Sequence, residues 1–484
     1  MTESGSPHQE RHADQLRAGA EDAPAPIGLR RNCVSLLENF AQTLGVLSPA
    51  GTISIIIPLL IVSAGNGTWL LLLVTLSIFL VVMVSVLRFA SLHASAGSLA
   101  TFARLGLGRS GGLWGGWVYL LGISLCIPSA ILGAAIYLDF VLAPLTSGTD
   151  TVLRLSVLTV LLTVGAGFAA FRGVKLSTHL MLIIEGTSLT LMSFLLLLGM
   201  LRAHAWVDHA QTSLSGVSFM GLQGGLVSAF MLLAGFEGAT SLGEESHNPK
   251  SAIPRAILGC MVPLSVLYLI FAYCMVALGS RGLIAGQTTG LTVPFDNLAH
   301  AIGLPWLGAL SSLGVAASYF ACALGCLTVG ARVLYSMSRE GEFWPSFGEA
   351  HARTATPHRS IALICLVCTV IPVGMILGGQ DIGTAFNFLV QLGGIGIVGG
   401  YLIVAWALPF YLRRQKLLRR RDLAVAVLAC ALLAVVLILS VYPVPPRPYS
   451  YVIYVFLSSV VAGVCMSLFV RSRAVAAAEL GIGW

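Results

Sequence analysis

The sequence has few charged residues. Only 10% of its 484 residues are Asp, Glu, Lys or Arg, whereas 57% are hydrophobic and the mean hydropathy is +0.90. Because about 25% of the residues in a typical soluble domain are charged, this composition excludes that class. The chain is predicted to be an all-α integral membrane protein, since helices satisfy their own backbone polar groups within a bilayer.

The sequence also lacks the motifs of enzymes and metal sites. It has no HExxH pair and no set of metal ligands within its apolar segments. Nearly all of its ten cysteines lie inside apolar segments, which is typical of small packed residues rather than of disulfides or metal ligands. We therefore expect no enzymatic activity, no metal and no cofactor.

Twelve apolar segments follow a polar start. Residues 1–38 have mixed charge and no apolar stretch of the signal-peptide kind, which predicts a disordered tail. Each later segment is long enough to cross a hydrocarbon core of roughly 30 Å. Ten of them are predicted to form a core at residues 39–411, while residues 412–484 hold a basic loop, two more segments and a short C-terminus. The segments are predicted near residues 40–64, 69–90, 113–143, 152–170, 178–201, 221–243, 255–279, 306–336, 360–378, 382–411, 423–443 and 450–470.

The distribution of basic residues predicts an orientation. If the N-terminal tail is cytoplasmic, 23 of the 27 Lys and Arg residues fall on the cytoplasmic side, and the other four are Arg154, Arg202, Arg281 and Arg447. This asymmetry predicts that both termini are cytoplasmic in a plasma or inner membrane. The densest basic cluster, at residues 413–421, is interpreted as a topology determinant that touches anionic lipid, so no nucleic-acid partner is expected.

Two segments contain interruptions. The first includes Pro49 and Gly51 within Ser48–Thr52, and the sixth includes glycines on both sides of Glu237. Because Pro lacks an N–H and Gly permits non-helical backbone, each helix is predicted to stop and restart. The breaks occupy equivalent places in two successive groups of five segments, residues 39–201 and 221–411. This pattern predicts an inverted repeat with a binding site near the middle of the membrane.

The ends of broken helices supply ligands. Free N–H groups at a helix N-terminus suit a carboxylate, and free carbonyls at a C-terminus suit an ammonium group or another cation. A site between two breaks therefore matches both ends of a zwitterionic amino acid. The alternative is a proline kink used only for packing, since Pro58 also lies in the first segment.

Two carboxyl groups lie deep in apolar segments, where an ionisable residue is costly. Glu237 has three interpretations: a proton carrier, a binder of a cationic substrate group, or a structural tie between helices. Glu185, in the fifth segment, either faces a water-filled cavity, bonds a neighbour or takes part in coupling. Of the large side chains near the second break, Phe230, Met231 and Phe236, some are predicted to face the site.

Several stretches resemble one known family. AGFEGATSLGEESHNPKSAIPRAILG in the sixth segment is similar to the GFE…EE..NP...IPRAI signature of amino acid permeases in the amino acid/polyamine/organocation superfamily. Three further stretches agree with the family in order and spacing: LSPAG, FRGVKLSTHL, and ARVLYSMSREGEFWPSF with TPHRSIA. The segment LVQLGGIGIVGGYLIVAWALPFYLRR is similar to the tenth helix of the family. The resemblance covers roughly residues 38–415.

The resemblance implies a leucine-transporter-like fold of five plus five helices, with broken helices 1 and 6 and two additional helices. It also implies secondary transport of amino acids or related amines. The substrate carboxylate would lie against Ser48–Thr52 and the amino group near Ala234 and Gly235, and Met231 would stand at a gating position. The predicted substrate-binding residues are Ser48, Pro49, Ala50, Gly51, Thr52, Met231, Ala234, Gly235, Phe236 and Glu237, and the coupling candidates are Glu185 and Glu237.

The sequence departs from the family pattern at three places. SAGSLATF lacks the usual proline and tyrosines, Thr328 replaces a common Asn, and Glu185 stands near the position of a lysine that replaces sodium in some relatives. We predict a proton-coupled transporter that prefers neutral amino acids. The alternatives are an exchanger, a permease for cationic amino acids or polyamines, and a permease-like nutrient sensor. The expected partners are an amino acid or amine and the lipid bilayer; the sequence sets no oligomeric state.

Overall fold

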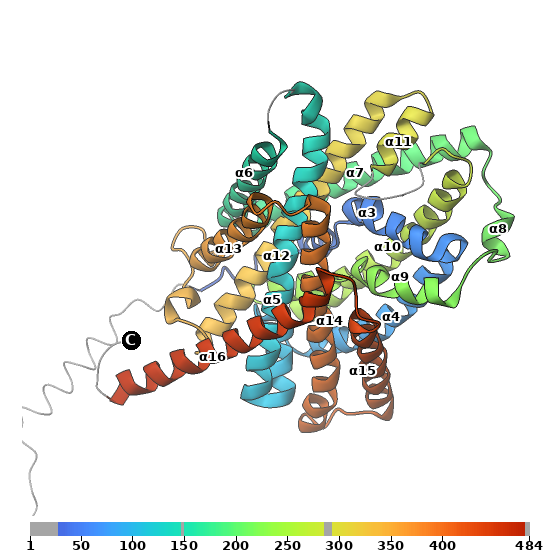
Figure 1. The fold of residues 1–484 in the computed structure, drawn as a ribbon. Coiled ribbons are helices and arrows are strands. Elements are labelled where there is room, and N and C mark those ends of the chain that lie inside the picture. Colours follow the sequence, from blue (N-terminus) through green and yellow to red (C-terminus); the bar gives the residue numbers. More distant parts are fainter. Residues whose placement is uncertain (1–27, 147–149, 285–292, 480–484) are drawn as a thin grey trace, which may run out of the picture.

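The computed structural model describes residues 28–146, 150–284 and 293–479. Its regular structure is helical, apart from one parallel bridge between Val34 and Ser246 (Figure 1). The principal helices are α2 (Leu36–Leu47), α3 (Pro49–Ala64), α4 (Thr68–Leu92), α5 (Ser98–Leu142), α6 (Thr151–Arg172), α7 (Val174–Ala203), α9 (Phe219–Met231), α10 (Pro249–Gly279), α12 (Pro305–Arg339), α13 (His358–Leu377), α14 (Ile382–Arg414), α15 (Arg420–Val441) and α16 (Val452–Glu479). Shorter helices are α8 (His209–Thr212), α11 (Pro294–Ala301) and the 3-10 helices η1 (Gly65–Gly67), η2 (Ala143–Leu145), η3 (Phe236–Leu242), η4 (Pro345–Gly348) and η5 (Tyr449–Tyr451).

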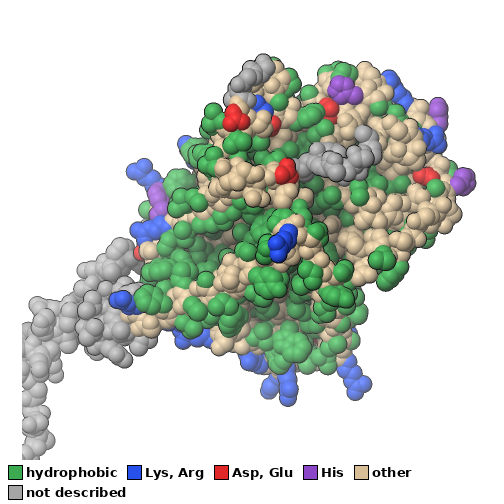
Figure 2. Space-filling model, viewed as in Figure 1, with side chains coloured by type: hydrophobic (Ala, Val, Ile, Leu, Met, Phe, Trp, Pro, Cys, Tyr) green, Lys and Arg blue, Asp and Glu red, His purple; other side chains and the backbone are tan. Residues whose placement is uncertain are grey.

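The helices confirm the predicted membrane class. Eleven helical ranges of the described chain are long and apolar enough to cross a membrane. The first of them, Leu36–Leu92, contains both α2–α3 and α4, joined by the turn at η1, so it corresponds to two of the twelve predicted segments. On the face in Figure 2, hydrophobic side chains cover the middle, and Lys, Arg and His gather toward the ends. The chain is therefore a multi-pass membrane protein.

Helices α5, α12 and α14 form the centre of the bundle. The buried share of the most apolar stretch is 72% in α12 and 67% in α14, whereas it is 28% in α6 and 22% in α15. Helices α5 and α14 pack closely because glycines meet where they cross: a Cβ atom on Gly122 would lie 2.6 Å from the backbone carbon of Gly396. Helices α6, α13, α15 and α16 surround this centre (Figure 1).

Several boundaries differ from the predictions. The third segment was expected from residue 113, but α5 begins at Ser98 and is kinked at Gly108, where φ is 78°. The seventh segment was expected from residue 255, but Pro249 at the first position of α10 starts that helix earlier. After the second break the chain forms the 3-10 helix η3 and then a turn that leads into α10.

The end of the bundle that carries the N-terminal segment is closed by buried polar contacts. The N–H groups of Cys33 and Val34 donate to the Glu245 carbonyl at 2.7 and 2.9 Å. The Glu245 carboxylate accepts two bonds from Arg332 of α12, at 2.5 and 3.0 Å, and both side chains are at most 4% exposed. These contacts join the N-terminal segment, the turn after η3 and α12.

A second polar cluster lies just after α12. Glu342 accepts from Arg104 at 3.3 Å and from Arg471 at 3.2 Å, and its side chain is 1% exposed. Glu340 pairs with the same Arg104. Burial, together with the negative charge of Glu340, raises the pKa of the Glu342 carboxyl to about 7, although Arg104, Arg471 and Arg109 oppose this rise.

This raised pKa predicts a pH dependence of stability. Between pH 5 and 7 the folded protein retains a proton on Glu342 that the unfolded chain, with a pKa near 4.5, has released. The free energy of unfolding therefore falls as the pH rises through this window. Glu342→Gln is expected to flatten that part of a plot of melting temperature against pH, whereas Glu349→Gln, at an exposed ion pair, leaves it unchanged. Parallel profiles for Glu342→Gln and the parent would contradict this assignment.

Candidate functional site

The first break is confined to one residue. Helix α2 ends at Leu47, and Ser48 adopts the left-handed conformation with φ 45° and ψ 61°. The Ser48 N–H still donates to the carbonyls of Leu44 and Gly45, and α3 begins at once with Pro49. Proline is favoured at this position because the first N–H groups of a helix have no partner within it. The break is thus narrower than Ser48–Thr52, and Pro49–Thr52 form the first turn of α3.

The second break is wider and depends on a tyrosine. Helix α9 ends at Met231, and Gly235 adopts φ 99° before η3 begins. The Gly235 N–H donates to the Tyr401 hydroxyl at 2.8 Å. In an uninterrupted α-helix this N–H would bond to the carbonyl of Met231. The break therefore removes the N–H group that would normally donate to the Met231 carbonyl at the end of α9.

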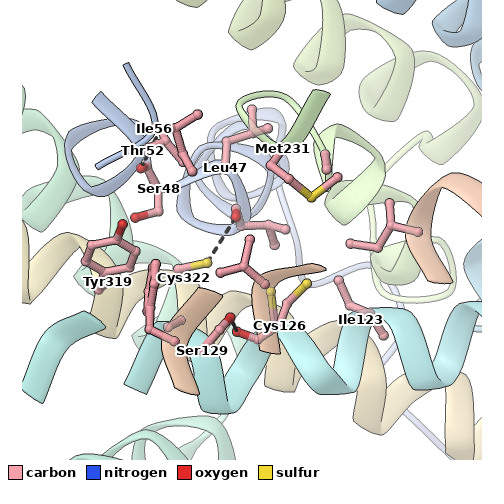
Figure 3. Close-up of a pocket in the computed structure, with 17 residues that line it drawn as sticks. Leu47, Ser48, Thr52, Ile56, Ile123, Cys126, Ser129, Met231, Tyr319 and Cys322 are labelled. Carbon is pink, nitrogen blue, oxygen red and sulfur yellow. Dashed lines mark hydrogen bonds between the residues drawn. The ribbon is translucent and has the colours of Figure 1, made fainter. Parts of the chain in front are cut away.

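A cavity of about 80 Å³ lies between the two breaks. Its walls come from α2 and α3, α5, the end of α9, α12 and α14 (Figure 3). None of the lining residues carries a charged or amide side chain. They are Val46, Leu47, Ser48, Thr52, Ile56, Ile123, Cys126, Ser129, Ala130, Met231, Ala234, Tyr319, Cys322, Cys326, Phe386, Val390 and Ile397.

The structure brings only some of the predicted site residues to this cavity. Ser48, Thr52, Met231 and Ala234 line it. The other predicted binding residues, Pro49, Ala50, Gly51, Gly235, Phe236 and Glu237, shape the two breaks but are absent from the lining. Of the three large side chains near the second break, only Met231 reaches the cavity, as Figure 3 shows for its thioether.

Hydroxyl groups tie the first break to neighbouring helices. The Ser48 hydroxyl lies 2.9 Å from that of Ser318 in α12, and the Thr52 hydroxyl lies 3.0 Å from that of Tyr268 in α10. The Tyr319 hydroxyl donates to the Gly51 carbonyl at 3.1 Å. The polar groups that face the cavity are therefore hydroxyls and helix ends rather than ions.

Glu237 lies behind the cavity as a bridge between three helices. It is fully buried, and its two carboxyl oxygens accept from Tyr119 of α5, at 2.9 Å, and from Tyr401 of α14. Because Tyr401 also accepts the Gly235 N–H, the carboxyl group and the second break share one hydrogen-bond network. Among the three interpretations of Glu237, these contacts are those of a structural tie.

Aromatic rings pack beside that network. Phe79 of α4 stacks on Phe230 with 4.2 Å between ring centroids, and Phe236 stacks on Tyr401 at 5.0 Å. Phe236 is fully buried in this aromatic cluster, which explains why it does not reach the cavity. Stacked rings hold the second break in one conformation, since such pairs stabilise packing beyond the area they bury.

Glu185 approaches the first break from α7. One of its carboxyl oxygens accepts from the Ser318 hydroxyl at 2.7 Å, and Ser318 in turn accepts the Gly51 N–H at 3.1 Å. Its other oxygen, Oε2, is buried and accepts no hydrogen bond of standard geometry from the described residues, although the Ala50 N–H interacts with the carboxyl group. A continuous chain of hydrogen bonds therefore runs from Ser48 at the cavity through Ser318 to Glu185.

Met231 separates the central cavity from a second one of about 200 Å³. Both cavities are lined by Met231, Ile56 and Val390, and the second also has the amide side chains of Asn387 and Gln391. The thioether packs against α14 where Gly394 leaves room for it: a Cβ atom there would lie 2.5 Å from the sulfur. Met231 thus lies between an apolar cavity and a more polar one.

Four residues that complete the site were not predicted from the sequence. Ser318, Tyr401, Tyr119 and Tyr268 hold the two breaks but come from helices distant in the sequence. Each is a hydroxyl within an apolar segment, and this was the available signal, because such groups seek partners inside a membrane protein. The signal does not identify the partner.

Known proteins resemble this chain over most of its length. Residues 40–471 match the family model described as amino acid permease. The branched-chain amino acid permease BcaP of Bacillus subtilis is 22% identical over 348 residues, which are 68% of this chain and 72% of the relative. The L-asparagine permease of Streptomyces coelicolor is 25% identical over 66% of this chain and 65% of the relative.

A third relative, cationic amino acid transporter 4 of Mus musculus, is 24% identical over 50% of this chain and 36% of its own length. The relatives therefore differ in the substrates that their names state, and this chain spans only part of some of them. The family match, in contrast, extends from α2 to α16 and includes both breaks. The chain belongs to the amino acid permease family.

Proposed function

We propose that the protein transports neutral, mainly apolar amino acids across a cell membrane by alternating access, with both termini in the cytoplasm. The observation that carries this proposal is the composition of the central cavity, which lies between two helix breaks and has no charged side chain in its lining. A charged substrate side chain would be buried there without a counter-ion, at a large cost in free energy.

The zwitterionic part of the substrate is assigned to the helix ends. The Ser48 and Thr52 side chains line the cavity at the start of α3, where the positive end of the helix favours the negative charge of a carboxylate. The carbonyls at the ends of α2 and α9 favour an ammonium group. The substrate side chain then faces Ile123, Cys126 and Phe386.

Transport of cationic amino acids is the second candidate, since some relatives carry that name. It requires an acidic group at the cavity. Glu237 is held by two tyrosines behind the wall, and Glu185 is reached only through Ser318. Neither carboxyl group lines the cavity, so the geometry favours neutral substrates.

We further assign proton coupling to Glu185. Its buried oxygen Oε2 and its link through Ser318 to Ser48 connect proton binding with the break that holds the substrate. Binding of a proton removes the negative charge near the start of α3, where it competes with a substrate carboxylate. Protonated Glu185 therefore favours substrate binding, and release of the proton favours substrate release.

Glu185→Gln tests this role. The amide keeps an acceptor for Ser318 but cannot exchange a proton, so uptake driven by an inward proton gradient is expected to fall at least about tenfold while counterflow without a gradient persists. Both are measured in proteoliposomes with the same preparation, and Glu349→Gln at an exposed ion pair serves as the control. Gradient-driven accumulation at the parent level in Glu185→Gln would refute the assignment. Uptake that requires sodium and ignores pH would refute proton coupling as a whole.

A further inference from the structure

A basic cavity of about 200 Å³ lies at the end of the bundle crossed by the N-terminal segment, and it shares no lining residue with the central cavity. Three separate parts of the chain contribute cations to it. Arg30 comes from the N-terminal segment, Arg172 and Lys175 from the corner between α6 and α7, and Arg353 from the turn before α13. In the part of the chain that the structure describes, none of these residues lines the central cavity or bonds to either helix break.

The basic cavity has an excess of positive charge. Its one lining carboxylate, Glu245, is occupied by the buried pair with Arg332. None of the four basic side chains forms an ion pair with any residue in the described ranges 28–146, 150–284 and 293–479. All four are exposed, so they can reach a ligand from solution.

Neutral donors complete the basic cavity. The first turn of α7, Val174–Leu176, lines it, and the N-cap residue Gly173 provides no side-chain cap for the free N–H groups of this turn. Two hydroxyl side chains, Thr354 and Thr356, also line it and lie 2.8 Å apart, and the Thr356 hydroxyl donates to the Phe171 carbonyl at 3.3 Å. Cations, hydroxyls and the positive end of a 30-residue helix thus converge on one small space.

We propose that the basic cavity binds a phosphate group, carried by either an anionic lipid or a soluble phosphate compound. A phosphate offers several strong acceptor oxygens in a small volume, and arginine forks match them in pairs. The two oxygens of a carboxylate lie in one plane, whereas the terminal oxygens of a phosphate point in three directions, as do the donors around this cavity.

Bound phosphate has a structural consequence. It connects Arg30 with Arg172 and Arg353, and thereby ties the N-terminal segment to two other parts of the chain. The same segment already bonds to the turn after η3 through Cys33 and Val34. Phosphate therefore stabilises the closed form of this end of the bundle. We also expect bound phosphate to slow transport. This second effect rests on the proposed function, whereas phosphate binding does not.

Thermal unfolding of the purified full-length protein tests the binding. In a neutral detergent without added lipid, inorganic phosphate is titrated against sodium chloride of equal ionic strength. In a second arm without phosphate, phosphatidylglycerol is added and compared with phosphatidylcholine, whose phosphate is balanced by choline. We expect a saturable rise in melting temperature in at least one arm: a response to phosphate alone identifies a soluble ligand, and a response to phosphatidylglycerol alone identifies lipid.

Variants locate the site. Arg172→Gln and Arg353→Gln, tested singly and together, are expected to raise the ligand concentration for half of the effect by about tenfold or more, because each removes a charged donor. Both residues are exposed, so the variants should fold. Arg413→Gln/Arg420→Gln, which removes two exposed cations from the adjoining ends of α14 and α15, is the matched control. The absence of a saturable response in both arms, or an unchanged response in the Arg172 and Arg353 variants, would overturn the proposal.

Discussion

Gly235→Ala is expected to reduce transport by about a hundredfold or more, because it forces the second break out of its conformation. At φ 99° an L-residue is strained, and the new Cβ atom would lie 2.4 Å from Cγ1 of Val46. Val46 has little freedom to move, because Gly238 and Gly325 lie close to its other methyl group. A Cβ atom added to either glycine would lie 2.9 Å from that methyl group. The free energy of unfolding is expected to fall by about 2–4 kcal/mol from strain and overpacking.

Counterflow of a neutral amino acid and the melting temperature measure these two effects. Gly259→Ala in α10 is the matched control, because its Cβ atom meets nothing within 4 Å, and it should leave both quantities nearly unchanged. Val46→Ala combined with Gly235→Ala removes one clashing methyl group and should recover part of the lost stability. Transport at the parent rate in Gly235→Ala would show that the break does not control the site.

Glu237→Ala has the second large expected effect. It leaves the buried hydroxyls of Tyr119 and Tyr401 without their shared acceptor and opens a cavity between three helices. Loss of a buried network of this kind costs about 3–5 kcal/mol, so we expect little folded protein and no measurable transport. Melting temperature and yield after detergent extraction measure the effect.

Glu237→Gln and Tyr401→Phe keep the variants folded and separate the roles of the network. Gln retains one acceptor oxygen, so the expected cost is about 1–2 kcal/mol. Tyr401→Phe also removes the acceptor of the Gly235 N–H, so its effect on transport should exceed that of Glu237→Gln. In the double variant the two stability effects should not add, because both variants disturb the same hydrogen-bond network. Additive effects would show that Glu237 and the second break act independently.

The helical membrane fold could be predicted from the sequence because hydropathy is averaged over long stretches. Single polar residues change that average little. Both breaks could also be located from the sequence, since Pro49 and Gly235 mark backbone that cannot continue as a helix. Their extent was harder to predict: the first shrinks to Ser48 because Pro49 suits the first position of α3, and the second extends through η3. Local signals therefore set the positions of the breaks, whereas tertiary contacts set their length.

The partners of the breaks were not predictable from the sequence. Phe236 and Glu237 stand next to Gly235 in the chain, yet the left-handed turn and the 3-10 helix direct them into the aromatic and tyrosine network behind the cavity. Ser318, which links Glu185 to Ser48, is one of many small residues in α12. Only the packing of α7 and α12 against α3 distinguishes it.

Uptake into proteoliposomes distinguishes a transporter of neutral amino acids from one of cationic substrates. Purified protein is reconstituted, a proton gradient (acidic outside) is imposed at fixed sodium, and initial uptake of leucine and arginine is compared with that in protein-free liposomes. The uncharged cavity between the two breaks predicts that leucine accumulates, that a proton ionophore abolishes its accumulation, and that arginine stays at the background level. Accumulation of arginine or a polyamine, without accumulation of any neutral amino acid, would contradict the proposed preference for neutral substrates.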